Sequence, residues 1–302
     1  MIKPINDSSE EYHSSPLMGT STMVSGYNSK TGEINLAKVK AYIDGTTEIS
    51  KSLQKIFDLG NVQHNVVLEQ DLSQVVIVPK FEAVPDITKK AQVEAFKIAG
   101  SLAEMPDFKP IKGKTIKAQA EVFKAANPAL YYINEKEFKL ISGAFEVISS
   151  CAEASQMISN ALFVEHSFYW PEKGIKTRPD IVGETDSGEL YICNYKTIHD
   201  LQKYGSHIFS HSYDIRAMQE IEIIEQALCR KVKHYFFLFQ EKTPPFSLKC
   251  VRISDIDYDI ASDEYKSLKN TVLIAMKNKY YPQPAFKIEE SKVYRAPQKE
   301  SF

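Results

Sequence analysis

Arg178-Pro179-Asp180, followed fourteen residues later by Asn194-Tyr195-Lys196, is the part of the sequence that decides the fold. The first tripeptide lies in a stretch at 175–184 and the second in an apolar stretch at 190–197, and each stretch predicts a β-strand. Asp180 and Asn194 therefore belong to consecutive strands. Because successive side chains of a strand point to opposite faces, Asn194 and Lys196 project from the same face.

Periodic apolar residues around these tripeptides predict an α/β core. The expected order is helix, three strands, helix, two strands, helix, which gives a mixed sheet flanked by helices. The expected ranges are helices at 134–160, 213–229 and 257–279, and strands at 163–170, 175–184, 190–197, 232–240 and 248–253. We therefore expect a single domain at 34–285, with its core at about 140–285.

The N-terminal half is expected to be mainly helical and to pack against this core or extend it. Apolar spacing predicts helix between residues 36 and 70 and again near 88–100, with a short strand at 75–79. Residues 1–33 are rich in Ser, Gly, Thr and Asn and predict a flexible arm, and residues 286–302 predict a polar tail.

Charge and composition limit the classes of function. The 37 Lys and Arg residues nearly balance the 39 Asp and Glu residues, giving a net charge of −2, so any nucleic-acid binding must use a local basic surface. The four cysteines lack metal-ligand spacing and predict reduced thiols. The sequence has neither an apolar run long enough for a membrane span nor a secretion signal region, which predicts a soluble, cytoplasmic protein that binds no membrane.

The paired tripeptides also predict a chemistry. Hydrolysis of a phosphodiester needs an activated water and a cation beside the phosphate, and Mg²⁺ prefers hard oxygen ligands. Asp180 supplies a carboxylate, and Glu165 on the preceding strand adds another. Lys196 is placed to orient the attacking water or to stabilise the developing negative charge. This pattern is typical of the core of a metal-dependent nuclease.

Here the chain resembles the PD-(D/E)xK nuclease superfamily, and within it the nuclease domain of RecE (exonuclease VIII) and related phage exonucleases. The resemblance extends over roughly residues 8–285. It rests on segments that occur in the family's order: Glu11 to Pro16, Asp58 to His64, Leu68-Glu69, Val76 to Phe81, Glu165 to Trp170, the two core tripeptides, Tyr213 to Gln219 and Tyr281-Pro282.

The resemblance implies a Mg²⁺-dependent 5′→3′ exonuclease on double-stranded DNA, with Mn²⁺ as a possible substitute. It also implies a ring-like homo-oligomer, a single-strand annealing recombinase as partner, and a bacterial host cytoplasm. By position, the implied metal ligands and catalytic or supporting residues are Asp180, Lys196, Glu165, His64, Gln219 and the carbonyl of Tyr195. Asn194 would be a further metal ligand through its side-chain oxygen.

Two positions depart from the family pattern. Asn194 stands where the family has Asp or Glu, so one ligand charge is lost and Mg²⁺ affinity should fall. Ile223 stands four residues after Gln219, at the position where the family usually has a tyrosine. Three explanations of Asn194 remain open: a naturally weakened or inactive nuclease fold, an active enzyme that uses Asn or another carboxylate such as Glu189, and an Asp→Asn change made to trap an inactive enzyme.

Other interpretations of the sequence stand beside this one. The chain is alternatively a non-catalytic relative that binds DNA or scaffolds a partner, or an unrelated α/β protein with a chance motif. His207 and His211 have the spacing of helical zinc ligands, but no further ligand motif accompanies them. The lysine-rich region at 89–124 is either a solvated face or a surface that follows the phosphates of DNA.

Overall fold

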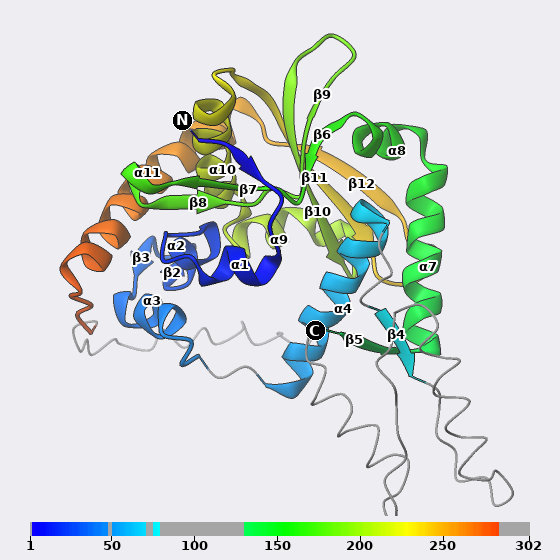
Figure 1. Cartoon of the computed structure of the whole chain (residues 1–302), viewed down its shortest axis with the longest axis horizontal. Coiled ribbons are helices and arrows are strands. Elements are labelled where there is room, and N and C mark those ends of the chain that lie inside the picture. The colour runs from blue at the N-terminus through cyan, green and yellow to red at the C-terminus, as the bar shows by residue number, and fades with distance from the viewer. Residues whose placement is uncertain (1, 48–49, 71–74, 79–129, 284–302) are drawn as a thin grey trace, which may run out of the picture.

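A five-stranded mixed sheet forms the centre of the molecule (Figure 1). The computed structural model describes residues 2–47, 50–70, 75–78 and 130–283. The expected helix near 88–100, the lysine-rich region at 89–124 and the tail at 286–302 lie outside these residues. No described helix has the length and apolar character needed to cross a membrane.

The sheet is built around β10 (Leu190–Ile198), whose first six residues are all buried. Its strand order is β12-β11-β10-β9-β6. The other strands are β6 (Ala161–Val164), β9 (Ile181–Glu184), β11 (Val232–Glu241) and β12 (Leu248–Arg252). β10 and β11 are parallel, and the remaining neighbours are antiparallel. A parallel pair needs a crossover, which α9 (Tyr204–Ser210) and α10 (Tyr213–Leu228) provide.

Helices cover both faces of this sheet, as the sequence predicted. On one face, α10 packs against the sheet and against α11 (Asp255–Asn278). On the other lie α7 (Glu135–Ser150) and α8 (Ala152–Ser159), which replace the single helix expected at 134–160 (Figure 1). Asn134 and Glu137 form a reciprocal capping box that fixes the start of α7.

The N-terminal residues differ from the expected flexible arm. They form β1 (Pro4–Ile5), α1 (Ser9–Ser14), α2 (Thr20–Val24), the hairpin of β2 (Tyr27–Asn28) and β3 (Glu33–Ile34), and then α3 (Leu36–Ile43). Met18 and Met23 are fully buried in the main core. The few apolar side chains of this Ser- and Thr-rich segment are thus enough to dock it.

Two of the expected strands are each broken in the middle. The stretch at 163–170 divides into β6 and β7 (Ser167–Trp170), and the stretch at 175–184 divides into β8 (Ile175–Thr177) and β9. β7 and β8 leave the central sheet and form a second sheet with β1. Pro179 has no N–H to donate, so a continuous ladder is disfavoured at this break.

A third packing unit lies beside the sheet. It contains α4 (Lys51–His64), the π-helical turn η1 (Asn65–Glu69), and the parallel pair of β4 (Val75–Val78) and β5 (Tyr131–Asn134). The π-turn follows directly on His64, and such turns often occur at functional sites. The last residue of α4, His64, lies beside Glu165 and Asp180, where β6 ends and β9 begins.

Lys176 should be a main attachment point of the N-terminal segment. Its buried ammonium donates to the carbonyls of Tyr12 and Ser15 (2.9 Å to Ser15) at the end of α1. Lys176→Met should leave both carbonyls without this donor and weaken the docking of residues 9–24 by about 2 kcal/mol. Hydrogen exchange of these amides should accelerate, whereas Lys173→Met, at an exposed lysine, should leave it unchanged. Unchanged protection in Lys176→Met would contradict this role.

Candidate metal centre

The break in the two strands places two carboxylates together. Glu165 lies between β6 and β7, and Asp180 lies between β8 and β9. The backbone N–H of Glu165 donates to the carbonyl of Asp180 at 3.0 Å, which ties the two breaks to each other. Glu165 has a φ of 51°, a left-handed conformation that a glutamate rarely adopts and that is enriched at functional sites.

His64 at the end of α4 completes a three-residue cluster. Its Nδ1 lies 3.3 Å from a carboxylate oxygen of Glu165 and 3.9 Å from Oδ2 of Asp180. One ligand atom from each of His64, Glu165 and Asp180 fits within 4.8 Å of the others, close enough to hold one ion. His64 lies 101 positions before Glu165 in the chain, whereas Glu165 and Asp180 are 15 positions apart.

Asp180 also anchors Lys196. Its Oδ2 accepts from the backbone N–H of Tyr195 at 2.7 Å and from the Lys196 ammonium at 3.0 Å. The same ammonium donates to the carbonyl oxygen of Tyr195 at 3.0 Å. The structure therefore brings the amine of Lys196 and the carbonyl of Tyr195 to the edge of the cluster.

Arg178 holds Glu165 from the side opposite His64. Its Nε donates to Glu165 Oε2 at 3.1 Å, and its Nη1 donates to the carbonyl of Asp7 at 2.8 Å. Although burial opposes it, the neighbouring hydroxyls of Ser167 and Tyr169 and the charge of Arg178 lower the pKa of Asp7. The N-terminal segment thus helps to fix a carboxylate of the cluster, a role that the sequence did not reveal.

The charges of the cluster stabilise one another. Burial alone would lower the pKa of His64, but the carboxylate of Asp180 and the hydrogen bond and charge of Glu165 outweigh it and raise the pKa. Burial likewise opposes the charged form of Lys196, and Asp180 again reverses the effect and raises the pKa of the amine. The carboxylates thus favour the protonated forms of both His64 and Lys196.

Asn194 lies next to the cluster, but its oxygen is engaged elsewhere. Oδ1 accepts from the backbone N–H of Asp180 at 3.0 Å. Nδ2 donates to the carboxylate of Glu220 at 3.1 Å and to the hydroxyl of Tyr235 at 2.7 Å. A backbone donor on one side and a carboxylate on the other fix the orientation of the amide. Asn194 therefore positions Asp180 from behind, in contrast to the predicted ligand role.

Glu220 is the acidic residue that the sequence analysis missed. It lies on α10, is 4% exposed, and accepts hydrogen bonds from Asn194 and Tyr235. Burial and the nearby charge of Asp180 raise its pKa to about 7, although the hydrogen bond from Tyr235 opposes the shift. This carboxyl group thus lies directly behind Asn194. The signal available in the sequence was that Glu220 directly follows Gln219, a predicted site residue.

The other predicted site residues lie elsewhere. Gln219 is fully buried and donates to the carbonyls of Met18 (2.9 Å) and Lys176 (2.8 Å), so it fastens the N-terminal segment to β8. Glu189 is exposed and pairs with His234 at 3.3 Å, so it does not replace the acid missing at position 194. The rings of His207 and His211 lie in tilted contact with centroids 4.1 Å apart, and they do not belong to a metal-binding group in the part of the chain that the structure describes.

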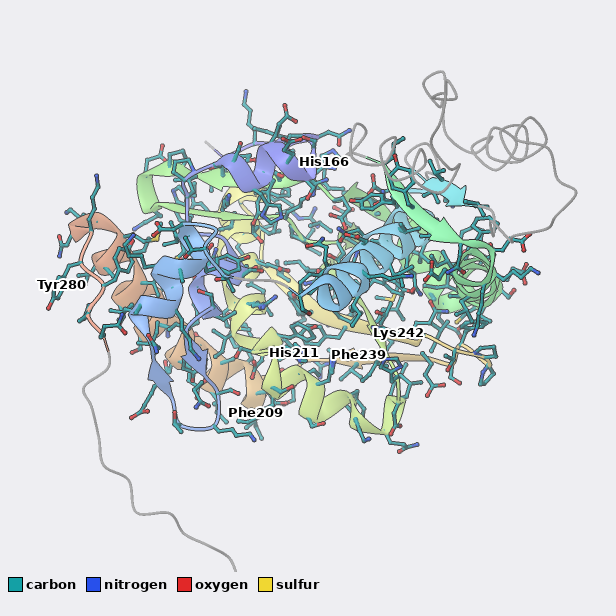
Figure 2. All side chains as sticks on the ribbon, turned by 90° about the horizontal axis from the view of Figure 1, so that it is seen from below. His166, Phe209, His211, Phe239, Lys242 and Tyr280 are labelled. Carbon is teal, nitrogen blue, oxygen red and sulfur yellow. The ribbon has the colours of Figure 1, made fainter. Side chains whose placement is uncertain are left out.

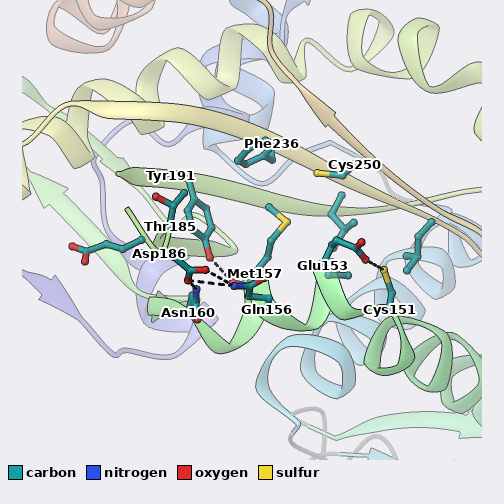
Figure 3. Close-up of a pocket in the computed structure, with 14 residues that line it drawn as sticks. Cys151, Glu153, Gln156, Met157, Asn160, Thr185, Asp186, Tyr191, Phe236 and Cys250 are labelled. Atoms are coloured by element: carbon teal, nitrogen blue, oxygen red, sulfur yellow. Dashed lines mark hydrogen bonds between the residues drawn. The ribbon is translucent and has the colours of Figure 1, made fainter. Parts of the chain in front are cut away.

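A hollow of about 430 Å³ lies away from this cluster, between α8 and the strands β10 to β12 (Figure 3). The apolar part of its lining includes Met157, Tyr191 and Phe236. At one end, Asp186 accepts hydrogen bonds from the side-chain amides of Gln156 and Asn160 (Figure 3). None of the cluster residues lines it, so it belongs to a separate surface.

The donor set is compatible with a divalent cation. Two carboxylates and the Tyr195 carbonyl are oxygen ligands of the kind preferred by Mg²⁺ and Mn²⁺, and an imidazole nitrogen is tolerated better by transition metals such as Mn²⁺. His64, Glu165 and Asp180 would supply the side-chain ligands.

Comparison with solved structures supports the fold. A crystal structure of a candidate exonuclease from Eubacterium rectale matches with a TM-score of 0.58, covering 91% of this chain and 88% of that chain at 13% sequence identity. No known protein family and no curated protein matches the sequence. At this level of identity the match shows a shared fold alone, and the mixed sheet of this structure confirms the predicted mixed α/β architecture.

An aspartate at position 194 should destabilise the metal-free protein. In Asn194→Asp, a second buried carboxylate would face Glu220 across the 3.1 Å that now joins amide and carboxylate, at a cost of about 3 kcal/mol at pH 8. Urea unfolding in EDTA should show this loss, and it should shrink at pH 5, where one carboxyl is protonated. Asn194→Asp/Glu220→Gln should recover most of it. Equal stability of Asn194→Asp and the unmodified chain at pH 8 would contradict the pairing.

Glu220 should also give the protein a measurable pH dependence. Its folded pKa of about 7 exceeds the ordinary 4.5, so the folded state binds more protons between these values and stability falls as pH rises through them. The fall amounts to roughly 3 kcal/mol if this group dominates. Glu220→Gln should remove it and be the more stable form at pH 8 in EDTA, as measured by urea unfolding. Parallel pH profiles for the two proteins would contradict the assignment.

Proposed function

We propose that this protein is a metal-dependent deoxyribonuclease that hydrolyses phosphodiesters at the His64, Glu165 and Asp180 cluster. The observation that supports the proposal most is the convergence of these three ligand atoms within 4.8 Å, with the Lys196 ammonium 3.0 Å from Asp180. A cation ligand set next to a fixed amine is what phosphodiester hydrolysis requires. The shared fold with a candidate exonuclease agrees with this chemistry.

Each residue then has a defined task. A bound Mg²⁺ or Mn²⁺ would lower the pKa of a water and stabilise negative charge on the phosphate. Lys196 donates to Asp180 and to the Tyr195 carbonyl, so a phosphate oxygen entering beside them meets a positioned cationic donor. Arg178 keeps the carboxylate of Glu165 directed at His64. Asn194 accepts the backbone N–H of Asp180, and Glu220 in turn holds the amide of Asn194.

The finer proposal is a RecE-like exonuclease that degrades linear double-stranded DNA in the 5′→3′ direction for homologous recombination. Its support is the ordered series of sequence segments that resemble this family, from Glu11 to Pro282. The same resemblance underlies the proposed homo-oligomeric ring and the annealing recombinase as partner. Sedimentation of the purified chain would test the ring, since a purely monomeric protein would contradict it.

Lys196→Met should abolish cleavage while the fold is retained. Removing one charged donor at such a site costs about 100-fold or more in rate. Release of nucleotides from 5′-labelled linear duplex DNA with Mg²⁺ or Mn²⁺ measures this, and EDTA should stop the reaction. Lys233→Met, at an exposed lysine at the far end of β11, is the matched control and should cleave normally. Retained activity in Lys196→Met would show that the site is assigned wrongly.

End labelling and topology test the exonuclease assignment separately. A 5′→3′ exonuclease should release the 5′ label before the 3′ label and leave a covalently closed circular duplex intact. Cutting of the closed circle would overturn the exonuclease assignment but not the nuclease assignment.

A non-catalytic DNA-binding relative is the second candidate. The observation in its favour is Asn194, whose oxygen bonds to the backbone of Asp180, so the strand supplies no second carboxylate to the cluster. Binding of linear duplex without nucleotide release, in either Mg²⁺ or Mn²⁺, would favour this candidate. Release from the unmodified chain would exclude it.

A further inference from the structure

A small hollow opens between α4, α7 and the ends of β10 and β11. Its volume is about 240 Å³. Helix α4 contributes Ile56, Leu59, Gly60 and Gln63, α7 contributes Glu137, Leu140 and Ile141, and the strand ends contribute Thr197, His199, Lys242 and Thr243. Nothing in the proposed chemistry uses this hollow.

The strand end of the hollow carries an unbalanced cation. The ammonium of Lys242 is half-buried and has no hydrogen bond or ion pair within the described residues, and burial lowers its pKa. Glu137, the acid that lines the same hollow, is already bonded to Lys55 at 2.6 Å and to the backbone N–H of Asn134 at 2.8 Å. The charge of Lys242 also contributes to lowering the pKa of nearby His207 to about 4, after burial and His211.

A half-buried cation without a counter-charge favours an anionic ligand. The hydroxyls of Thr197 and Thr243 and the imidazole of His199 line the same end and are further hydrogen-bonding groups for it. Lys242 comes directly after β11, and its backbone N–H donates to the carbonyl of Ile198 at 2.9 Å, which fixes the residue at the sheet end (Figure 2).

The opposite wall of the hollow is apolar. Leu59, Leu140 and Ile141 form it, and Gly60 leaves space, since a Cβ there would meet no atom within 4 Å. A volume of 240 Å³ is below the roughly 300–1,000 Å³ of sites that enclose a whole small molecule. The hollow therefore suits one unit of a longer ligand, with an anionic group and a flat apolar part.

The hollow adjoins the candidate metal centre. Gln63 lines the hollow, and the next residue, His64, lies in the cluster. Thr197 likewise lines the hollow and follows Lys196 on β10. Lys196 and Thr197 project from opposite faces of β10, so the two sites are connected through α4 and β10 rather than along one face of the sheet.

We infer that this hollow is a nucleotide subsite, in which Lys242 binds a phosphate and the leucine–isoleucine wall contacts the sugar and base of the strand being cleaved. The inference rests on the proposed nuclease function. It adds to that function a residue, Lys242, that binds the substrate at a position remote from the cleaved phosphate.

Two variants and two readouts test the subsite. Lys242→Met removes the cation, and Gly60→Leu fills the hollow with a residue that favours the helix more than glycine does. Binding of thymidine 5′-monophosphate in EDTA, followed by saturation-transfer NMR, should weaken about tenfold in each variant. In the cleavage assay, KM for linear duplex should rise severalfold at nearly constant kcat, because the lost contact is remote from the reacting phosphate. Lys233→Met is the control, and urea unfolding checks that each variant folds.

The outcomes separate the subsite from the nuclease function. One outcome is that the unmodified chain binds thymidine monophosphate, that Lys242→Met weakens this binding, and that the unmodified chain releases no nucleotides. This outcome would support the subsite and overturn the proposed function. If neither Lys242→Met nor Gly60→Leu changes DNA cleavage or thymidine monophosphate binding, the subsite is overturned and the proposed nuclease function stands. Failure of the unmodified chain to bind thymidine monophosphate would overturn the subsite. Inorganic phosphate that binds as tightly as the nucleotide, and resists Gly60→Leu, would overturn the role of the apolar wall.

Discussion

At the point where two strands separate, the side chain of Asp180 makes a hydrogen bond that the backbone of the β-ladder would otherwise make. β9 pairs with β10 as far as Cys193, and beyond it the Asp180 carboxylate accepts the N–H of Tyr195, which the ladder would otherwise have bonded. The backbone N–H of Asp180 is in turn bonded by Asn194. This exchange of side-chain for backbone hydrogen bonds lets β7 and β8 diverge while the backbone groups stay satisfied. The cluster, the position of Lys196 and the second sheet all depend on it.

The core elements were predictable because their periods are regular. β10, β11, β12, α10 and α11 begin and end within two residues of the expected positions. The breaks at Glu165 and Pro179 were not predicted, although polar residues and a proline mark them in the sequence, because their cause is tertiary: the halves belong to different sheets. Residues 2–33 were misjudged because composition does not show that Met18 and Met23 find a core to enter. In the sequence, Glu220 cannot be distinguished from other polar residues on a helix. Its role becomes visible in the structure, where Asn194 lies beside it.

The pairing of Asn194 with Glu220 changes how the unusual asparagine is understood. A carboxylate at position 194 would compete with Glu220 for the same buried space, whereas the amide gives Glu220 a donor and Asp180 an acceptor at once. Buried polar groups are stable when every member of the network is satisfied. In this chain the buried acid beside position 194 thus lies on the helix rather than on the strand, with Tyr235 as a third partner. The surroundings of position 194 are complementary to an amide.

Helix α4 connects the cluster to the adjoining hollow, and a buried polar chain fixes it to the sheet. Gln63 donates to the hydroxyl of Tyr195 at 2.7 Å, that hydroxyl donates to Gln240, and Gln240 donates to the carbonyl of Ala144 on α7. Because Gln63 and His64 are consecutive, this series of hydrogen bonds also fixes the position of the His64 imidazole in the cluster. The π-turn after His64 then redirects the backbone, so that Val66 and Leu68 remain buried. The helix that lines the hollow is therefore the same helix that ends at His64.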